Sequence, residues 1–489
     1  MSGAAPRLLA AFLLGATSVL GFAPFHAFPL PVAALALLAA LWQPAAPRRA
    51  AALGLAFGAG LFLAGVSWVY VSLHVFGGMP ALLAGLAAFL FCCYLALYPA
   101  LAGYLFARLR SGRLLADALL LAAAWTLTEW LRGWLLTGFP WLALGYAQTP
   151  PSPLAGYAPV LGVQGVGFVA AAIAALAGLG FRARGRWRTG AAAIAVLLAA
   201  GAGLGGIAWT QAAAKPVTVS LLQGNIEQGL KWRPERLRQS LETYLQLAAA
   251  HPAQLIVLPE TALPLMLDQL PADYARTLQD AAGGDILFGI AEQDANGRFY
   301  NSAIGLTGAG IQAYRKRHLV PFGEFTPPAF AWTLAWLNIP MSNFSAGAAG
   351  QPPLRLAGEK VAVNVCYEDI FGEELIRALP EATLLINLSN TAWFGDSLAQ
   401  PQHLQIARMR ALETGRAMLR ATNTGMTAII TPDGRVGQAL PPFAAGALRG
   451  EVAGYSGVTP YVRWGNAAVL LLVAAGFLPA LAGRRCSAT

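Results

Sequence analysis

Charged side chains are scarce in this sequence. They make up 11% of its 489 residues, whereas hydrophobic side chains make up 57%. Because an ordinary soluble domain has about a quarter of its residues charged, this composition excludes that class and indicates an integral membrane protein. The length leaves room for two or three domains.

Acidic residues are nearly absent outside one stretch of the chain. Residues 211–463 hold 20 Lys and Arg against 21 Asp and Glu, so the rest of the chain has 13 basic residues and only two acidic ones. These basic residues lie mainly in every second junction between apolar runs, namely Arg7, Arg48, Arg49, Arg108, Arg110, Arg113, Arg182 to Arg188, Arg484 and Arg485. This alternation predicts that the junctions are cytoplasmic. Topology thus explains the net charge of +10, and we expect no nucleic-acid partner.

The apolar runs are long enough to cross a membrane, which takes about 20 residues for a helix. Eight runs qualify, at 8–24, 28–45, 51–72, 80–107, 114–137, 159–181, 189–210 and 464–483. Seven crossings from a cytoplasmic N-terminus would put the polar stretch outside, and the eighth would return the C-terminus to the cytoplasm. We predict seven membrane helices in 1–212, an extracytoplasmic domain in 213–458, and an eighth helix with a cytoplasmic tail in 459–489.

The polar stretch has a different pattern, with short apolar runs separated by turn signals. Strands are predicted at 217–222, 255–258, 286–290, 361–365, 384–386 and 427–430. Amphipathic helices are predicted at 234–249, 274–282 and 402–416. Strands and helices that alternate in this way predict a layered α/β domain.

Cysteine is rare, with four in the chain. Cys92 and Cys93 lie in a predicted span and Cys486 in the predicted tail, so Cys366 has no disulfide partner in the outer domain. An unpaired thiol in an oxidising compartment is either buried or chemically useful. Cys366 lies in VNVCYED, where an apolar strand meets acidic residues, so it is a candidate nucleophile or a small core residue.

Lysine is equally rare, and occurs only at positions 215, 231, 316 and 360. Lys316 stands between two arginines. An ammonium is a compact charge suited to an oxyanion, although a solvated surface lysine is the alternative. Glu260, in LIVLPETALP, directly follows a predicted strand and is a candidate general base or a simple turn residue.

Five motifs occur together in this order, namely LQGNIEQGLKW, LPETALP, YRKRHLVPFGEF, VNVCYED and NLSNTAWFGDS. They resemble the apolipoprotein N-acyltransferase family of the nitrilase, or carbon–nitrogen hydrolase, superfamily. The resemblance implies a polytopic helical bundle of about eight spans that carries an extracytoplasmic nitrilase-like αββα sandwich. It also implies that Glu260 is the base, Lys316 the oxyanion-binding cation and Cys366 the nucleophile.

The resemblance further implies a two-step reaction. An acyl chain passes from a phospholipid to Cys366 as a thioester, then to the α-amino group of a diacylglyceryl-cysteine at the N-terminus of an apolipoprotein. The backbone N–H of Tyr367 would share the oxyanion with Lys316. The implied location is the bacterial inner membrane, with the catalytic domain periplasmic, both termini cytoplasmic and the enzyme a monomer.

Further positions match the family pattern. Glu324 is expected to orient Lys316, Glu368 to support the site, and Trp232 to contact substrate, although each could instead be a turn, surface or packing residue. An apolar stretch, FTPPAFAWTLAWLNIPMSNF, is predicted to form an arm at the bilayer, with a core helix as the alternative. Candidate lipid-binding residues in this arm and in the AWFGDS loop are Trp332, Trp336, Met341, Phe344 and Trp393.

Two rival functions remain. A membrane-tethered amidase or nitrilase would use the same three residues on a soluble amide. A transporter or receptor would need polar residues in the spans, which offer little beyond Asp117, Glu129 and Arg132. Glu129 and Arg132 could pair on one helix face or reach the membrane boundary.

His318 and His403 lack metal-site spacing and no phosphate loop follows a strand, so we predict no metal and no cofactor.

Overall fold

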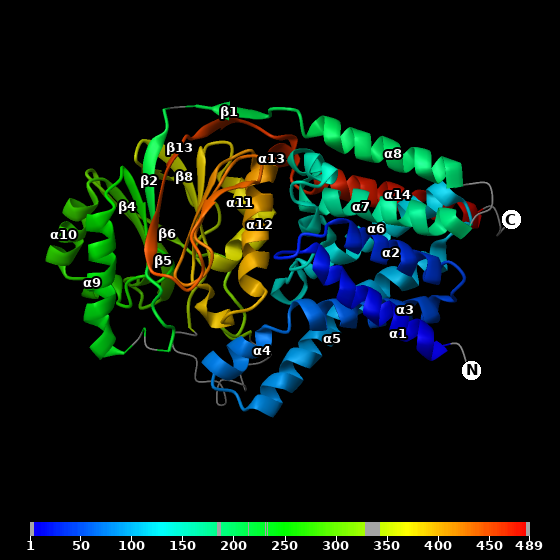
Figure 1. The fold of residues 1–489 in the computed structure, drawn as a ribbon, viewed down its shortest axis with the longest axis horizontal. Helices are drawn as coiled ribbons and strands as arrows, with labels where there is room; N and C mark the ends of the chain where they lie inside the picture. Colours follow the sequence, from blue (N-terminus) through cyan, green and yellow to red (C-terminus); the bar gives the residue numbers. More distant parts are fainter. Residues whose placement is uncertain are drawn as a thin grey trace. The chain divides into compact units, whose positions relative to one another are not determined.

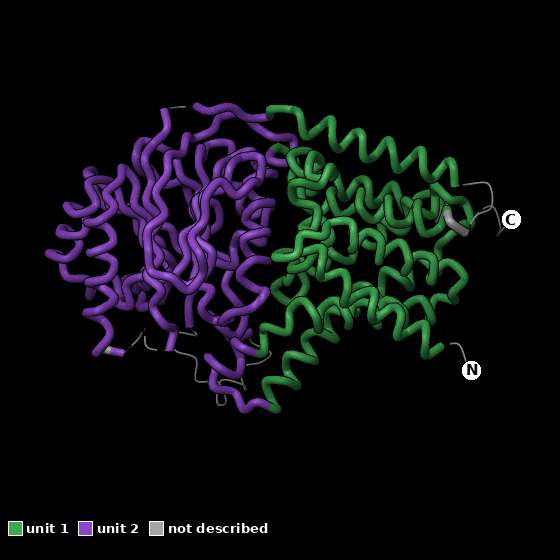
Figure 2. The backbone as a smooth tube through the Cα atoms, in the orientation of Figure 1, with its two compact units in different colours: residues 1–70, 82–208, 463–489 green, residues 71–81, 209–462 purple. Residues whose placement is uncertain are grey.

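The computed structural model describes residues 4–182, 187–213, 215–229, 231, 233–327 and 343–485. The chain divides into two compact units, which are coloured separately in Figure 2. The first comprises Met1–Tyr70, Leu82–Ala208 and Arg463–Thr489, and the second comprises Val71–Ala81 and Trp209–Val462.

The first unit is helical. Its longer helices are α1 (Ala4–Ser18), α2 (Pro29–Trp42), α3 (Pro47–Gly65), α5 (Ala81–Leu109), α6 (Leu114–Arg132), α7 (Ala158–Arg182), α8 (Trp187–Leu204) and α14 (Ala467–Arg485). Each overlaps one predicted apolar run. Within the described ranges, five helices are long and apolar enough to span a membrane, or six if the bent pair Pro47–Gly65 and Val69–Phe76 is one span. The count of eight spans stays a prediction.

Small residues let α1 and α3 pack closely. A Cβ atom on Gly15 would lie 1.9 Å from the Phe57 carbonyl oxygen, and one on Gly60 would lie 2.0 Å from that of Phe12. Any larger side chain would force the two helices apart. Close backbone approach through glycine is a common way for apolar helices to associate.

Helix α6 ends at Arg132, earlier than the predicted end at residue 137. The two charged residues of its last turn bind the backbone that follows. Glu129 Oε1 accepts from the N–H of Leu144 at 2.9 Å, and Arg132 Nη1 donates to the carbonyls of Phe139 and Trp141 at 2.7 and 2.6 Å. These charges therefore hold an irregular segment against the helix, where backbone groups need partners inside the protein.

The second unit is an αββα sandwich, as the resemblance implies (Figure 1). One sheet has the strand order β13-β2-β3-β4-β5-β6 and the other β12-β11-β10-β9-β8-β7. The strands of the first are β2 (Val217–Gln223), β3 (Leu255–Val257), β4 (Asp285–Gln293), β5 (Phe299–Thr307), β6 (Gly310–Arg315) and β13 (Gly446–Val452). Those of the second are β7 (Leu354–Leu356), β8 (Glu359–Val365), β9 (Leu384–Ser389), β10 (Met418–Thr422), β11 (Ala428–Ile430) and β12 (Val436–Ala439). A short ribbon pairs β1 (Thr210–Ala212) with β14 (Tyr455–Gly457).

Helices cover the outer face of each sheet (Figure 1). α9 (Pro234–Ala250) and α10 (Ala272–Ala282) pack on the first sheet, and α11 (Gly372–Leu375) and α12 (Ala399–Thr414) pack on the second. The predicted amphipathic helices at 234–249, 274–282 and 402–416 are therefore confirmed as α9, α10 and α12.

Side chains that point alternately to the two faces of each strand fill the space between the two sheets and the space between each sheet and its helices. Val219 and Leu221 of β2 pack between the sheets against Ile386, while Leu222 packs beneath α9 against Tyr244. Successive residues of a strand point to opposite faces, so apolar residues on both faces bury both sides of the sheet.

Parallel strands at the centre of each sheet place the site. β2, β3 and β4 run parallel to one another, as do β8, β9 and β10. The loops that follow β3, β8 and β9 carry Glu260, Cys366 and Asn390. The carboxyl ends of parallel strands meet at one edge of a sheet. Asn390 of the second sheet donates its N–H to Glu260 of the first at 2.8 Å, so the two edges meet at these residues.

The segment Val71–Ala81 belongs to the sandwich unit although it lies between two apolar helices in the sequence. Ser72 Oγ donates to the Trp393 carbonyl at 2.7 Å, and the Phe76 ring lies edge-on to the Trp393 ring at 5.9 Å. Trp393 lies in the short helix η10 (Thr391–Phe394), directly after β9. An apolar segment from the N-terminal half thus contacts a loop next to the site.

Candidate active site

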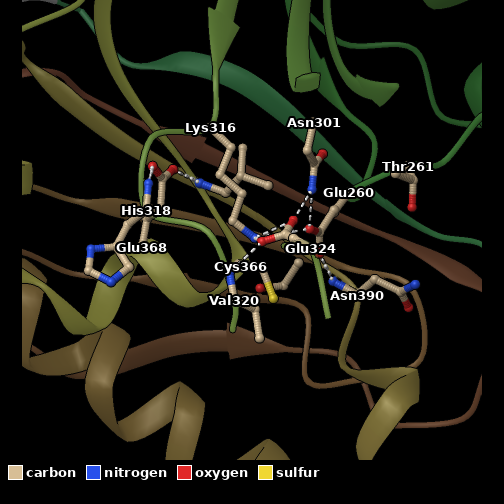
Figure 3. A network of polar contacts seen from close by, with 12 residues as sticks. Glu260, Thr261, Asn301, Lys316, His318, Val320, Glu324, Cys366, Glu368 and Asn390 are labelled. Carbon is tan, nitrogen blue, oxygen red and sulfur yellow. Dashed lines mark hydrogen bonds and ion pairs between the residues drawn. The ribbon is translucent and has the colours of Figure 1, made fainter. Parts of the chain in front are cut away.

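Cys366 directly follows β8 and begins the short helix η8 (Cys366–Ile370). Its φ of +54° lies in the left-handed region, which is uncommon for a residue with a side chain and marks a strained turn. The residue is 9% exposed. The sharp change from strand to helix carries the thiol into the cluster of polar side chains drawn in Figure 3.

Glu260 follows β3, and its carboxylate is bound on both oxygens. Oε1 accepts from Asn301 Nδ2 at 2.8 Å and lies 3.5 Å from Lys316 Nζ, while Oε2 accepts from the N–H of Asn390 at 2.8 Å (Figure 3). The residue is 7% exposed. These donors hold the carboxylate in one orientation beside the thiol.

Lys316 follows β6 and is almost completely buried. Its Nζ lies 2.8 Å from Glu324 Oε2 and 3.5 Å from Glu260 Oε1. Burial alone would lower the pKa of Lys316, but the negative charges of Glu324 and Glu260 outweigh it and raise that pKa above its ordinary value. The ammonium therefore keeps its charge at neutral pH.

The Cys366 thiol has the opposite tendency. Burial, reinforced by the charge of Glu260, raises its pKa to about 12, although Lys316 lowers it. The resting thiol is therefore protonated, and it needs a base at the moment of attack. Glu260 is the carboxylate whose charge contributes most to this shift.

Two further carboxylates hold the frame of the site. Glu324 accepts from Lys316 Nζ, from Asn301 Nδ2 at 2.7 Å and from the N–H of Val320 at 2.8 Å. Glu324 thereby fixes the Lys316 ammonium to the loop that carries Glu324. Its buried position argues against the surface-turn alternative.

Glu368 joins the lysine turn to the nucleophile turn. It accepts from the N–H of Val365 at 2.7 Å, from the N–H groups of Arg317 and His318 at 2.7 and 3.1 Å, and from Tyr314 Oη at 2.9 Å. Burial raises the pKa of Glu368, while Lys316 and these N–H groups oppose the shift. One side chain thus sets the spacing between β6 and β8 at the site.

Tyr367 lies next to Cys366 in an aromatic group. Its ring is 5.2 Å from that of Phe371 and 5.9 Å from that of His318, and the His318 and Phe371 rings stack at 3.6 Å. His318 Nδ1 also lies 3.1 Å from Glu374 Oε1. This packing fixes the turn that carries the Tyr367 N–H.

The predicted lipid-binding residues are partly described. Phe344 is half-buried, and its N–H donates to the Glu324 carbonyl at 2.9 Å. Trp393 is half-buried and contacts Phe76. The remaining predicted residues lie outside the described residues, namely Trp232, Trp332, Trp336 and Met341.

Three site residues were missed by the sequence analysis. Asn301 on β5 donates to both Glu260 and Glu324, and Asn390 binds Glu260 through its backbone. Lys231 is 1% exposed, and its Nζ donates to Thr261 Oγ1 at 2.6 Å and to the Glu260 carbonyl at 3.4 Å. A polar residue inside an apolar strand was the available signal for Asn301, and the rarity of lysine was the signal for Lys231.

No metal site is evident in the described part of the chain, where no group of three or more His, Cys, Asp or Glu side chains could hold an ion. The cluster instead offers a thiol, a carboxylate and an ammonium. Together these can attack a carbonyl, move a proton and hold an oxyanion.

Comparisons with known proteins match two families along the chain. Residues 14–176 match the family described as the apolipoprotein N-acyltransferase N-terminal domain, and residues 218–459 match the carbon-nitrogen hydrolase family. A solved carbon-nitrogen hydrolase from Helicobacter pylori is 18% identical with a TM-score of 0.39, over 48% of this chain and 89% of that one.

Whole-chain relatives are far more similar. The apolipoprotein N-acyltransferase of Nitrosomonas europaea is 51% identical over 98% of both chains. Those of Ralstonia nicotianae and Chromobacterium violaceum are 50% and 48% identical, each over 97% of this chain and 93% of the relative. At this identity and coverage, the chain belongs to the apolipoprotein N-acyltransferase family.

Proposed function

We propose that this enzyme transfers an acyl chain from a membrane phospholipid, through a thioester on Cys366, to an apolipoprotein. The acceptor is the α-amino group of an N-terminal diacylglyceryl-cysteine. The observation that carries this proposal is the buried thiol beside a carboxylate and an ammonium that are hydrogen-bonded to one another. The names of the whole-chain relatives support the choice of substrates.

In the first step, Glu260 takes the proton of the Cys366 thiol as sulfur attacks the ester carbonyl. The carbonyl oxygen becomes an oxyanion, held by Lys316 Nζ and by the backbone N–H of Tyr367. When this intermediate collapses, the carbon–oxygen bond breaks. The lyso-phospholipid leaves with the proton that Glu260 returns, and the acyl group stays on sulfur.

In the second step, the acceptor amine attacks the thioester carbonyl. Glu260 accepts the proton that the amine loses, and the same two donors hold the oxyanion. Collapse breaks the carbon–sulfur bond, the departing sulfur regains the proton, and an amide is released. The resting thiol and carboxylate are thus restored without any other reagent.

Lys316 suits this reaction because its charge is permanent. The neighbouring Glu324 and Glu260 raise its pKa, so it stays cationic while Glu260 cycles between charged and protonated forms. A fixed cation in a dry site stabilises a developing oxyanion more strongly than water does.

We also propose the membrane topology predicted from the sequence. The domain assignment is 1–212 for seven spans, 213–458 for the catalytic domain and 459–489 for the last span and tail. The arginine-bearing junctions support cytoplasmic termini and a periplasmic catalytic domain. Phe344 and Trp393 are proposed to touch acyl chains, which is supported by their half-buried aromatic rings beside the site.

The first experiment is mass spectrometry of the purified enzyme after incubation with phospholipid and no acceptor. We expect an acyl-sized adduct on Cys366 that hydroxylamine removes, and no adduct in Cys366→Ala. A folded enzyme that never forms this adduct would defeat the proposal. If the adduct forms and water releases it as free fatty acid as fast as an acceptor amine does, the chain is a hydrolase instead.

A further inference from the structure

A buried polar chain lies behind the nucleophile, in the second sheet and its covering helix. Its members are Asn387 on β9, Arg420 on β10, Asp369 in η8 and His403 on α12, and none is more than 1% exposed. None of them takes part in the reaction described above. Removing charged groups from water is costly, so each of them needs partners of its own inside the protein.

This buried polar chain of side chains ends on the backbone of Cys366. Asn387 Nδ2 donates to the Cys366 carbonyl oxygen at 3.1 Å and to Asn364 Oδ1 at 2.6 Å. Asn387 Oδ1 accepts from Arg420 Nη1 at 2.8 Å and from Ser389 Oγ at 2.9 Å. Since two donors face the amide oxygen, the amide nitrogen must face the Cys366 carbonyl, and the side chain has one orientation.

Asp369 fixes Arg420 in turn. Arg420 Nη1 lies 3.2 Å from Asp369 Oδ2, so a single guanidinium nitrogen joins the carboxylate to Asn387. His403 Nε2 lies 2.7 Å from Asp369 Oδ1 and donates to it, because a carboxylate can only accept. Burial and the charge of Arg420 lower the pKa of His403 against the pull of Asp369, so the ring is neutral at pH 7.

The anchored carbonyl shares a peptide plane with the oxyanion donor. The C=O of Cys366 and the N–H of Tyr367 belong to the same planar peptide unit, and in a trans unit they point in opposite directions. Holding the carbonyl therefore sets the direction of the N–H. The turn needs such a hold, because Cys366 has a strained φ of +54°.

We infer that Asn387 is a positioning residue for the oxyanion-binding N–H of Tyr367, and that Arg420 and Asp369 keep it in place. The inference rests on the proposed function, since it assigns the N–H its task. At an exposed turn, water would form these hydrogen bonds. Here the buried side chains of Asn387, Arg420 and Asp369 form them, and these side chains cannot reorganise during the reaction. Lys316 approaches the oxyanion from the first sheet, so each sheet of the sandwich supplies one oxyanion donor.

The test compares two variants with a matched control in the full-length enzyme. Asn387→Leu removes the anchor at similar volume, and Arg420→Lys keeps the charge but places its nitrogen nearer the backbone than Nη1, the atom that contacts both partners. Arg416→Lys is the control. Arg416 is as buried as Arg420, but its Nε and Nη2 donate to the carbonyls of Ala382 and Gly457.

Four quantities are measured for each protein: kcat and KM for thioester formation from phospholipid, the rate of Cys366 alkylation by uncharged iodoacetamide, and the thermal midpoint. The alkylation rate reports the reactivity of the Cys366 thiol, and this reaction needs no oxyanion donor. We expect Asn387→Leu and Arg420→Lys to lower kcat by about a hundredfold, the scale of losing a preorganised oxyanion donor. KM and the alkylation rate should change by less than about threefold, and Arg416→Lys should keep its kcat.

Two results would overturn the inference. If Arg420→Lys and Arg416→Lys lose equal activity in proportion to their thermal midpoints, the chain only stabilises the fold. If alkylation falls as far as acylation, the chain places the thiol and not the N–H. Arg420→Lys decides the question if Asn387→Leu does not fold. An unmodified enzyme that forms no thioester would overturn the proposed function itself, and the inference with it.

Discussion

Buried charges occur in both units of this enzyme, but their partners differ. In the helical unit, Asp117 accepts from the N–H groups of Ser111 and Gly112, and Glu129 accepts from that of Leu144. In the sandwich, Lys316 lies between two carboxylates beside a thiol. A charge bound to backbone groups holds the chain in shape. A charge whose partners are other titratable side chains can exchange protons and stabilise new charge, and the following predictions use this difference.

The largest contrast is expected between two buried cysteines. Cys366→Ala should abolish thioester formation and transfer, a loss of at least about a thousandfold, because no other group can carry the acyl chain. Cys92, buried in α5, is the matched control. Cys92→Ala should retain transfer within about twofold and lose only packing, as a small core deletion does. The measurement is acyl transfer to a diacylated peptide, and activity in a folded Cys366→Ala enzyme would contradict the assignment.

A second contrast uses one substitution in both units. Glu260→Gln should lower the rate of thioester formation by about 10²- to 10⁴-fold, since the amide cannot take the thiol proton. Glu129→Gln keeps an acceptor for the Leu144 N–H, so it should leave that rate unchanged and cost about 1 kcal/mol of stability. Single-turnover rates and thermal unfolding in detergent give both values. A comparable loss of rate in the two variants would contradict the difference that we draw between the buried charges of the two units.

The lysine at the centre of the site gives a third, smaller effect. Lys316→Met keeps much of the side-chain volume but removes the cation, and we expect kcat to fall by about 10²- to 10³-fold with little change in KM. The effect should be smaller than that of Cys366→Ala, because the Tyr367 N–H remains. Steady-state kinetics with a short-chain phospholipid test this, and a change confined to KM would assign Lys316 to substrate binding instead.

The sequence predicted Glu260, Lys316 and Cys366 as site residues, because each lies just after an apolar run and within a motif. The structure brings them into one cluster. Asn301 and Asn387 were not found, because their partners depend on strand pairing across long stretches of sequence, and an asparagine inside a strand has no periodicity of its own. The end of α6 at Arg132 was missed for a related reason, since its charged residues bind backbone groups further along the chain.

Some strands of the sandwich were predicted from the sequence and others were not. The parallel strands β2, β3, β8 and β9 were predicted as apolar runs because both of their faces are buried. β6 and β12 lie at sheet edges and are largely exposed, so polar residues interrupt their pattern and they were not predicted. The buried strands β5 and β10 were not predicted either. Burial on both faces was therefore not enough for a strand to be predicted.

Lys231 departs from the comparison between the units, as Arg416 does, and it gives the smallest predicted effect. It lies in the sandwich, yet its Nζ donates to Thr261 Oγ1 and to the Glu260 carbonyl, as the charges of the helical unit do. Burial lowers its pKa to about 8, against the attraction of Glu260. Because its contacts are the Thr261 hydroxyl and the Glu260 carbonyl, it should hold the turn of Glu260.

The sign of the resulting pH dependence follows from that lowered pKa. The unfolded lysine keeps its proton up to about pH 10.4, whereas the folded one releases it near pH 8, so the unfolded state binds more protons between these values. Stability should then rise with pH across this window, by up to about 3 kcal/mol relative to Lys231→Met. Thermal unfolding of both proteins from pH 7 to 10.5 measures the difference. A difference that stays flat across the window would mean that the ammonium keeps its proton throughout, and Lys231 would then join the charged cluster of the site.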